Sequence, residues 1–263
     1  MLDEFLVRHR VFTYDSVCEV LHKESPRSRA AVDVFLKRLC SKGRIGRIRR
    51  ELYFAIPPGE TADSCQVDLG LAASLLAPDV VLSHITALEH HTGAAVGSGG
   101  RVCFTTTAKI RPTTFHGVRF CPNRPHVKLS RTGHHDIQVE IVDRQGELVR
   151  VTGPERSLVD TLNSIKLCGG LKAVRPLLEK AITLDGFNMD RCVEYLRRLD
   201  NPSATVRTGW FLQRHEAHLS SGPLDYDLIH EHRPAQLRYL IPGDRGGTLI
   251  PQWKLIVPRE FEE

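Results

Sequence analysis

The stretch SPRSRAAVDVFLKRLCSKGRIGRIRR, from Ser25 to Arg50, decides the fold of the first part of this chain. Its apolar residues recur at helical spacing as far as Gly43, and the pattern then changes to the alternation of short strands. The stretch holds seven arginines and two lysines against one carboxylate, Asp33, so its net charge is +8, whereas the whole chain of 263 residues carries +5. Positive charge concentrated on a helix and a following hairpin is typical of a surface that binds phosphates. Nucleic acid is therefore the expected partner.

Helix signals also precede this stretch. Apolar spacing predicts one short helix at the start of the chain and a second that begins after Thr13. In the third helix, Ser25 is placed as the N-cap and Pro26 as the first helical residue. Residues 45–56 then predict two short strands joined by a tight turn. Three helices followed by a basic hairpin are typical of a winged helix-turn-helix domain, which we place at residues 1–58.

The remaining sequence predicts a larger second domain of mixed α/β class, residues 65–263. Pro-Pro-Gly at residues 57–59 breaks the chain, and small polar residues follow it. Helical and strand-like periodicities then alternate with Gly, Pro and Asn. We expect helices at 68–76, 85–91, from 154 onward, 171–182, 189–199 and about 205–219, and strands at 80–83, 101–106, 118–121, 137–142, 147–151 and 253–257.

Composition excludes several classes of protein. Hydrophobic residues make up 41% of the chain, but no run of 18 or more apolar residues occurs, and the first ten residues contain carboxylates. We therefore expect a cytoplasmic protein without a membrane partner. The seven cysteines are odd in number and form no C-x-x-C pair, which argues against a disulfide framework and a zinc site. No metal or cofactor is expected.

The basic residues divide between the helix and the hairpin. The apolar face of the helix leaves Lys37 on the opposite, exposed side, whereas Arg29 lies nearer the apolar face and is a weaker candidate. Because side chains alternate along a ribbon, Arg47 and Arg49 should both project away from Ile48. Helix cations can donate to guanine in the major groove, and hairpin cations suit phosphates or the minor groove. The residues expected to contact DNA are Arg27, Ser28, Lys37, Arg38, Arg44, Arg47, Arg49 and Arg50. The same basic face would also suit contact with another protein.

Catalytic patterns are weak in the second domain. A metal-dependent nuclease would need carboxylates such as Pro78-Asp79 and Glu140-Ile141-Val142, but valine stands where a catalytic lysine is usual. Ser83-His84 lacks the G-x-S-x-G elbow of a serine hydrolase. We expect no catalytic residues and no enzyme, and a nuclease guided by the winged helix is the alternative.

Aromatic and basic residues also occur together near the C-terminus. Core packing is the favoured interpretation, because aromatic residues are usually buried, and contact with a partner is the alternative. The residues are Tyr226, Arg233, Arg238, Arg245, Trp253 and Lys254.

Several segments resemble the AbiEi-like antitoxins, the transcriptional-regulator subunits of type IV abortive-infection systems. The matching pieces are FTYDSVCEVL, LKRLCSKGRIGRIRRELYFAIP, VLSHITALEHHTG, PERSLVDTL and WKLIVP, which span most of the chain in the order of the family. The wing reads RRELYF where the family often has a glycine before the final aromatic residue, and Glu51 thereby alters the shape and charge expected at the wing tip.

The resemblance implies a winged-helix repressor of its own operon, bound to inverted repeats in double-stranded DNA. It also implies an α/β domain that neutralises a nucleotidyltransferase-like toxin, with or without a stable complex between the two proteins. At the positions that match the family, the resemblance implies DNA contacts by Arg27, Lys37, Arg38, Arg47, Arg49 and Arg50.

Overall fold

The first six elements form a helical layer on a small sheet. The computed structural model describes residues 2–24, 28–219, 226, 229, 234–244 and 246–261. The elements are α1 (Leu2–Arg8), β1 (Val11–Thr13), α2 (Tyr14–Glu24), α3 (Arg29–Ser41), β2 (Ile45–Arg49) and β3 (Leu52–Ala55). The strands pair antiparallel in the order β1-β3-β2. Strand β1 was not expected from the sequence. The order of elements is compatible with the expected winged helix.

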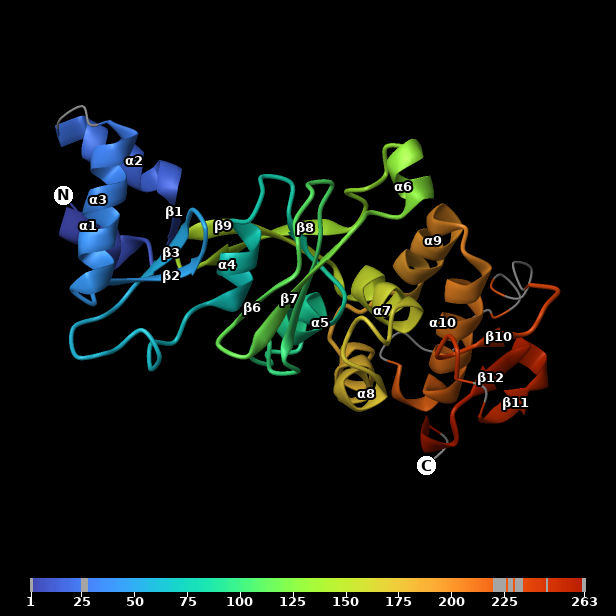
Figure 1. Ribbon diagram of the computed structural model, residues 1–263. Helices are drawn as coiled ribbons and strands as arrows, with labels where there is room; N and C mark the ends of the chain where they lie inside the picture. The colour runs from blue at the N-terminus through green and yellow to red at the C-terminus, as the bar shows by residue number, and fades with distance from the viewer. Residues whose placement is uncertain are drawn as a thin grey trace.

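A mixed six-stranded sheet follows in the middle of the molecule (Figure 1). The strand order is β6-β7-β5-β4-β9-β8, with β5 parallel to β7 and β4 parallel to β9. This region comprises α4 (Leu69–Ser74), β4 (Val81–Leu82), α5 (Ile85–His91), β5 (Arg101–Thr105), β6 (Thr113–Phe115), β7 (Val118–Asn123), α6 (Val127–Arg131), β8 (Val139–Arg144) and β9 (Glu147–Thr152).

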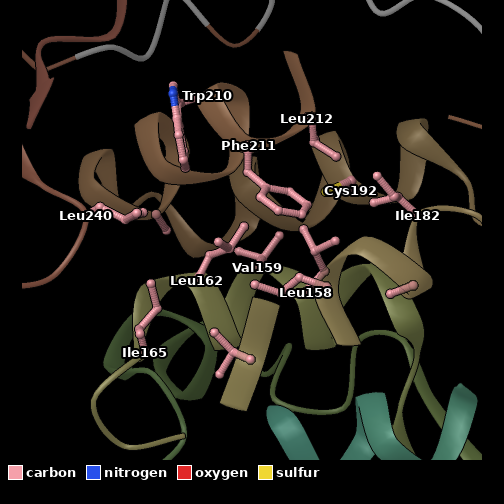
Figure 2. Close-up of a cluster of buried hydrophobic side chains, with 14 of the residues drawn as sticks. Leu158, Val159, Leu162, Ile165, Ile182, Cys192, Trp210, Phe211, Leu212 and Leu240 are labelled. Carbon is pink, nitrogen blue, oxygen red and sulfur yellow. The ribbon is translucent and has the colours of Figure 1, made fainter. Parts of the chain in front are cut away.

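The C-terminal part is mainly helical and lies at the opposite end from α1–α3 (Figure 1). Leu158 and Val159 of α7 pack toward Phe211 of α10 in its core (Figure 2). Its elements are α7 (Pro154–Asn163), α8 (Leu171–Ala181), α9 (Met189–Leu199), α10 (Pro202–Arg214) and a small sheet of β10 (Arg238–Tyr239), β12 (Leu255–Val257) and β11 (Thr248–Ile250). Short 3-10 turns occupy 216–218, 251–253 and 259–261. The mixed α/β class expected from the sequence is confirmed.

The N-terminal sheet is buried on both of its faces. Tyr53 belongs to the apolar cluster beneath α1–α3. Leu52 and Phe54 belong to a second cluster, which continues into the six-stranded sheet through Val102 and Phe115. Because one apolar cluster crosses from the first sheet to the second, the basic helix and hairpin are held in a fixed position on the second part of the chain.

Two general features of the described residues bear on function. No helix among them combines the length and apolar character needed to cross a membrane. Histidine, cysteine and carboxylate side chains in the same part of the chain form no group of three or more that could hold a metal ion.

Candidate nucleic-acid interface

Helix α3 presents one apolar and one exposed face, as its periodicity predicted. Val32, Leu36 and Leu39 are buried, while Val34, with 66% of its surface exposed, and Lys37 face solvent. The apolar face holds the helix against α2 and the hairpin, so its opposite face is free to enter a groove of a duplex.

The start of α3 differs from the expectation. Ser28, not Ser25, is the N-cap, because its side-chain oxygen accepts a hydrogen bond from the Ala31 N–H at 3.3 Å. Arg29 is consequently the first helical residue. Ser25, Pro26 and the expected contact Arg27 lie outside the described residues. Ser28 stays a candidate phosphate ligand, because its hydroxyl hydrogen is not used by the cap.

The expectation that Arg47 and Arg49 share one face of the hairpin is wrong. The pairing register shifts between them, so Arg47 lies opposite Tyr53 whereas Arg49 lies opposite Leu52. Such a bulge adds a residue to one strand and reverses the alternation of its side chains. Tyr53 faces the helices and Leu52 faces the second sheet. Arg47 is therefore exposed beside α3, and Arg49 turns toward the second part of the chain.

The surroundings of Arg49 agree with this orientation. Its side chain lines a cavity of about 420 Å³ between the hairpin and residues 74–78. Its Nη1 atom is buried and finds no hydrogen-bond partner within the described ranges. Arg49 is half-buried, and we therefore remove it from the set of expected DNA contacts.

A groove of about 460 Å³ lies between α3 and the hairpin. Cations from both elements meet in it, so a helix and a hairpin contribute to a single positive surface. In the described part of the chain, neither Lys37 nor Arg47 forms an ion pair, although the Arg47 Nε donates to the Arg49 carbonyl at 3.2 Å. The groove is lined by Tyr14, Arg29, Asp33, Leu36, Lys37, Cys40, Arg47, Arg50, Glu51 and Tyr53.

The phenols and the thiol in the groove remain protonated at neutral pH. Burial, with a smaller contribution from the neighbouring Cys18, raises the pKa of Tyr14 to about 12. Burial also raises the pKa of Tyr53, partly offset by the positive charge of Arg47. The pKa of the Cys40 thiol is raised by burial as well. The fixed charges of the groove are therefore those of its Arg, Lys and carboxylate side chains.

The other expected contacts differ in their availability. Arg38 is exposed on α3, and Arg50 is exposed at the tip of the hairpin, 3.8 Å from the Glu51 carboxylate. Arg44 forms an ion pair with Asp3 of α1. The Arg44 guanidinium holds the pKa of Asp3 below its usual value. Arg44 must release this carboxylate before it can bind a phosphate with the same donor.

Arg29 was underestimated from the sequence. Instead of lying against the apolar face, its side chain is 67% exposed and borders the groove. Its Nη2 donates to the Glu51 Oε1 at 2.7 Å. The helical wheel describes the helix by itself, whereas the partner Glu51 comes from the hairpin. Only the fold brings these two side chains together.

A second basic segment also escaped the sequence argument. Residues 101–133 contain seven Lys and Arg residues and no carboxylate, and a charge count along the chain would have found it. Arg124 and Lys109 are exposed, and Lys128 forms an ion pair with Asp200. The net charge of this segment is therefore strongly positive, and exposed cations such as Lys109 and Arg124 are accessible to an anionic partner.

The carboxylates considered for a nuclease are not brought together. Asp79 accepts hydrogen bonds from the Thr106 hydroxyl and the Thr107 N–H, both at 2.6 Å, and so fixes the loop before β4. Glu140 lies on β8, with β9 between it and β4, which corresponds to a separation of roughly 10 Å across the sheet. The hydrogen bonds of Asp79 to Thr106 and Thr107 therefore give this carboxylate a structural role.

Ser83 and His84 form a buried pair between β4 and α5. The Ser83 Oγ lies 2.8 Å from the His84 Nδ1, and Asn123 approaches the His84 Nε2 at 3.1 Å. Burial lowers the pKa of His84, which keeps its imidazole neutral. His84 is therefore a buried, hydrogen-bonded residue of the core.

In the aromatic and basic group near the C-terminus, Trp253 belongs to the core, whereas Tyr226, Arg238 and Lys254 are half-buried. Trp253 is fully buried, and its indole N–H donates to the Gln213 Oε1 at 2.6 Å. The core interpretation of Trp253 is confirmed. The Lys254 ammonium donates to the Ala235 carbonyl at 3.2 Å. Arg233 and Arg245 lie outside the described residues.

Comparison with known proteins shows a shared fold. No protein-family model and no curated protein matches this chain. Among solved structures it is similar to the RV2827C protein from Mycobacterium tuberculosis, with a TM-score of 0.62 and 16% sequence identity. The similarity covers 99% of this chain and 93% of that protein, so the arrangement of elements is shared over nearly the whole length.

Proposed function

We propose that this chain is a sequence-specific DNA-binding regulator whose N-terminal region acts as a winged helix-turn-helix. The observation that carries the proposal is the groove between α3 and the hairpin, where Lys37 and Arg47 lie without carboxylate partners in the described residues. Helix α3 would enter the major groove, and the hairpin would contact the flanking phosphates. The basic segment 101–133 offers further phosphate contacts.

The binding should depend steeply on salt. Lys37, Arg38, Arg47 and Arg50 are among the exposed cations of the helix and hairpin. If these, together with a cation of the basic segment 101–133, neutralise about five phosphates, the slope of log affinity against log salt concentration is roughly −4 to −5.

A gel-shift titration tests the proposal. The probe is a promoter fragment from upstream of the gene of this chain, and a scrambled duplex of equal length is the control. A shift specific to the promoter fragment, with the steep salt slope, is expected. Equal binding to both duplexes, or to neither, would contradict the regulator function.

The resemblance to AbiEi-like antitoxins extends the proposal to the second part of the chain. We propose that this protein represses its own operon in the cytoplasm without catalytic activity, and that it counteracts a nucleotidyltransferase-like toxin. Inverted repeats would require a dimer or two monomers side by side. Co-expression with a neighbouring nucleotidyltransferase is expected to restore the growth that the toxin alone suppresses. Persistent growth arrest despite normal expression of this chain would refute the antitoxin function.

A further inference from the structure

Arg29 stands where a DNA-recognition helix reads bases. It is the first residue of α3, directly after the N-cap Ser28, and most of its side chain is exposed. In helix-turn-helix proteins the N-terminal residues of the recognition helix contact base edges, because that end points into the major groove. The position alone makes Arg29 a candidate for base contact rather than for phosphate contact.

Three interactions hold Arg29 in one orientation. Its Nη2 donates to the Glu51 Oε1 at 2.7 Å, and its guanidinium carbon lies 5.1 Å from the centre of the Tyr14 ring. The Tyr14 hydroxyl also donates to the Arg29 carbonyl at 3.2 Å. Because Tyr14 is buried, both the backbone and the side chain of Arg29 rest on an immobile group.

Glu51 is itself anchored. It occupies the two-residue tip of the hairpin with φ of 63°, and its carbonyl accepts a hydrogen bond from the Tyr14 N–H at 2.9 Å. A residue with a side chain is uncommon in this left-handed region, where glycine would be favoured. An exposed ion pair contributes little to stability, so a carboxylate placed here is better explained by orientation of its partner.

The remaining donors of Arg29 match one base. A guanidinium carries five N–H groups, and Glu51 uses one of them. Arg29 borders the groove, and its other N–H groups suit the O6 and N7 acceptors of guanine in the bidentate geometry of Arg. We propose that Arg29 is the specificity-determining residue of this interface, reading a guanine, and that Glu51 and Tyr14 are its positioning residues. This inference rests on the proposed DNA-binding function.

The first test replaces Arg29 with Lys, which keeps the charge but removes the planar fork. The probes are the promoter fragment and the scrambled duplex, with thermal melting as a check that the variant folds. Arg29→Lys is expected to lower the ratio of promoter to scrambled affinity by roughly tenfold or more while leaving the scrambled affinity unchanged. An unchanged ratio would overturn the role of Arg29. If the wild-type protein shows no preference, the proposed function itself fails.

The second test is a double-mutant cycle. Glu51→Gln should raise the affinity for the scrambled duplex, since a negative charge is lost, and lower the affinity ratio several-fold because Arg29 is released. In the Arg29→Lys background, Glu51→Gln should no longer change the ratio. Glu19→Gln, which removes the same charge from the exposed face of α2, is the matched control and should leave the ratio unchanged. An equal effect of Glu51→Gln in both backgrounds, or none in the wild type, would overturn the positioning role.

Discussion

Phe54 of the hairpin packs edge-on against Phe115 of the six-stranded sheet, with ring centroids 5.5 Å apart and an interplanar angle of 68°. Phe115 in turn stacks on His116 at 3.9 Å. Edge-to-face aromatic pairs add about 0.5–1.5 kcal/mol to the burial of their surface. The wing of the proposed DNA-binding region thus rests on an aromatic support from the second part of the chain, and the two parts should resist unfolding as one unit.

Replacing Phe115 with Ala should loosen the hairpin from a distance. Truncation of a buried Phe usually costs about 3–5 kcal/mol, and here the cavity would open beneath Phe54. Hydrogen exchange followed by mass spectrometry should show faster exchange of residues 45–55. Phe187→Ala, in the separate C-terminal cluster, is the matched control. Protection of residues 45–55 that is equal in the two variants would show that Phe115 does not support the wing.

Arg47 and Arg49 should differ in their effect on DNA binding although each carries one charge. Arg47→Ala would remove one of the proposed phosphate contacts, so the magnitude of the salt slope should fall by about 1. Arg49→Ala should leave the slope unchanged, because that side chain faces residues 74–78. Each variant loses one positive charge, so each serves as the charge-matched control of the other. Titrations at four or more salt concentrations measure both slopes. An equal decrease of the slope in the two variants would contradict the assignment of Arg47 and Arg49 to different faces of the hairpin.

The sequence predicted elements well where local signals were strong. Helices α5 and α9 begin and end at the predicted residues, and α9 has Asn188 as an N-cap whose side chain accepts the Asp190 N–H at 2.8 Å. The start of α3 was missed because two serines three residues apart both suit an N-cap, and local sequence does not choose between them.

Non-local pairing explains the other differences. The bulge that turns Arg49 away depends on the register of β2 with β3, which no alternation of residues encodes. Likewise, the Arg29–Glu51 contact joins residues 22 positions apart through a hairpin turn. The set of candidate cations was therefore largely predictable, whereas the face on which each one lies was not.

Asp79 should make stability dependent on pH at the acidic end. Burial raises its pKa, but hydrogen bonds from Thr106 and Thr107 outweigh that effect and leave the pKa below the usual value of 3.8. A lowered folded-state pKa stabilises the protein above about pH 3.8, and this contribution is lost as the pH falls through the folded-state pKa. Urea unfolding should show Asp79→Asn to be less stable than wild type at pH 7, with the difference shrinking below pH 4. The exposed Asp63→Asn is the control. A difference independent of pH would contradict the role of the charge.

Gly46 of β2 leaves room for the ring of Phe54, its cross-strand partner on β3. A Cβ atom at this position would lie 2.1 Å from the Cζ of Phe54, well inside van der Waals contact. The ring cannot retreat freely, since Phe115 packs against it. Gly46→Ala should therefore destabilise the protein by about 1–3 kcal/mol, as overpacking of a core usually does. Gly99→Ala is the matched control, because its nearest contact would be an ordinary 3.5 Å. Thermal and urea unfolding of both variants measure the cost. Equal stability of the two variants would mean that the Phe54 ring can move away from a Cβ atom at position 46. The close packing of Phe54 between Gly46 and Phe115 would then not limit the stability of the hairpin.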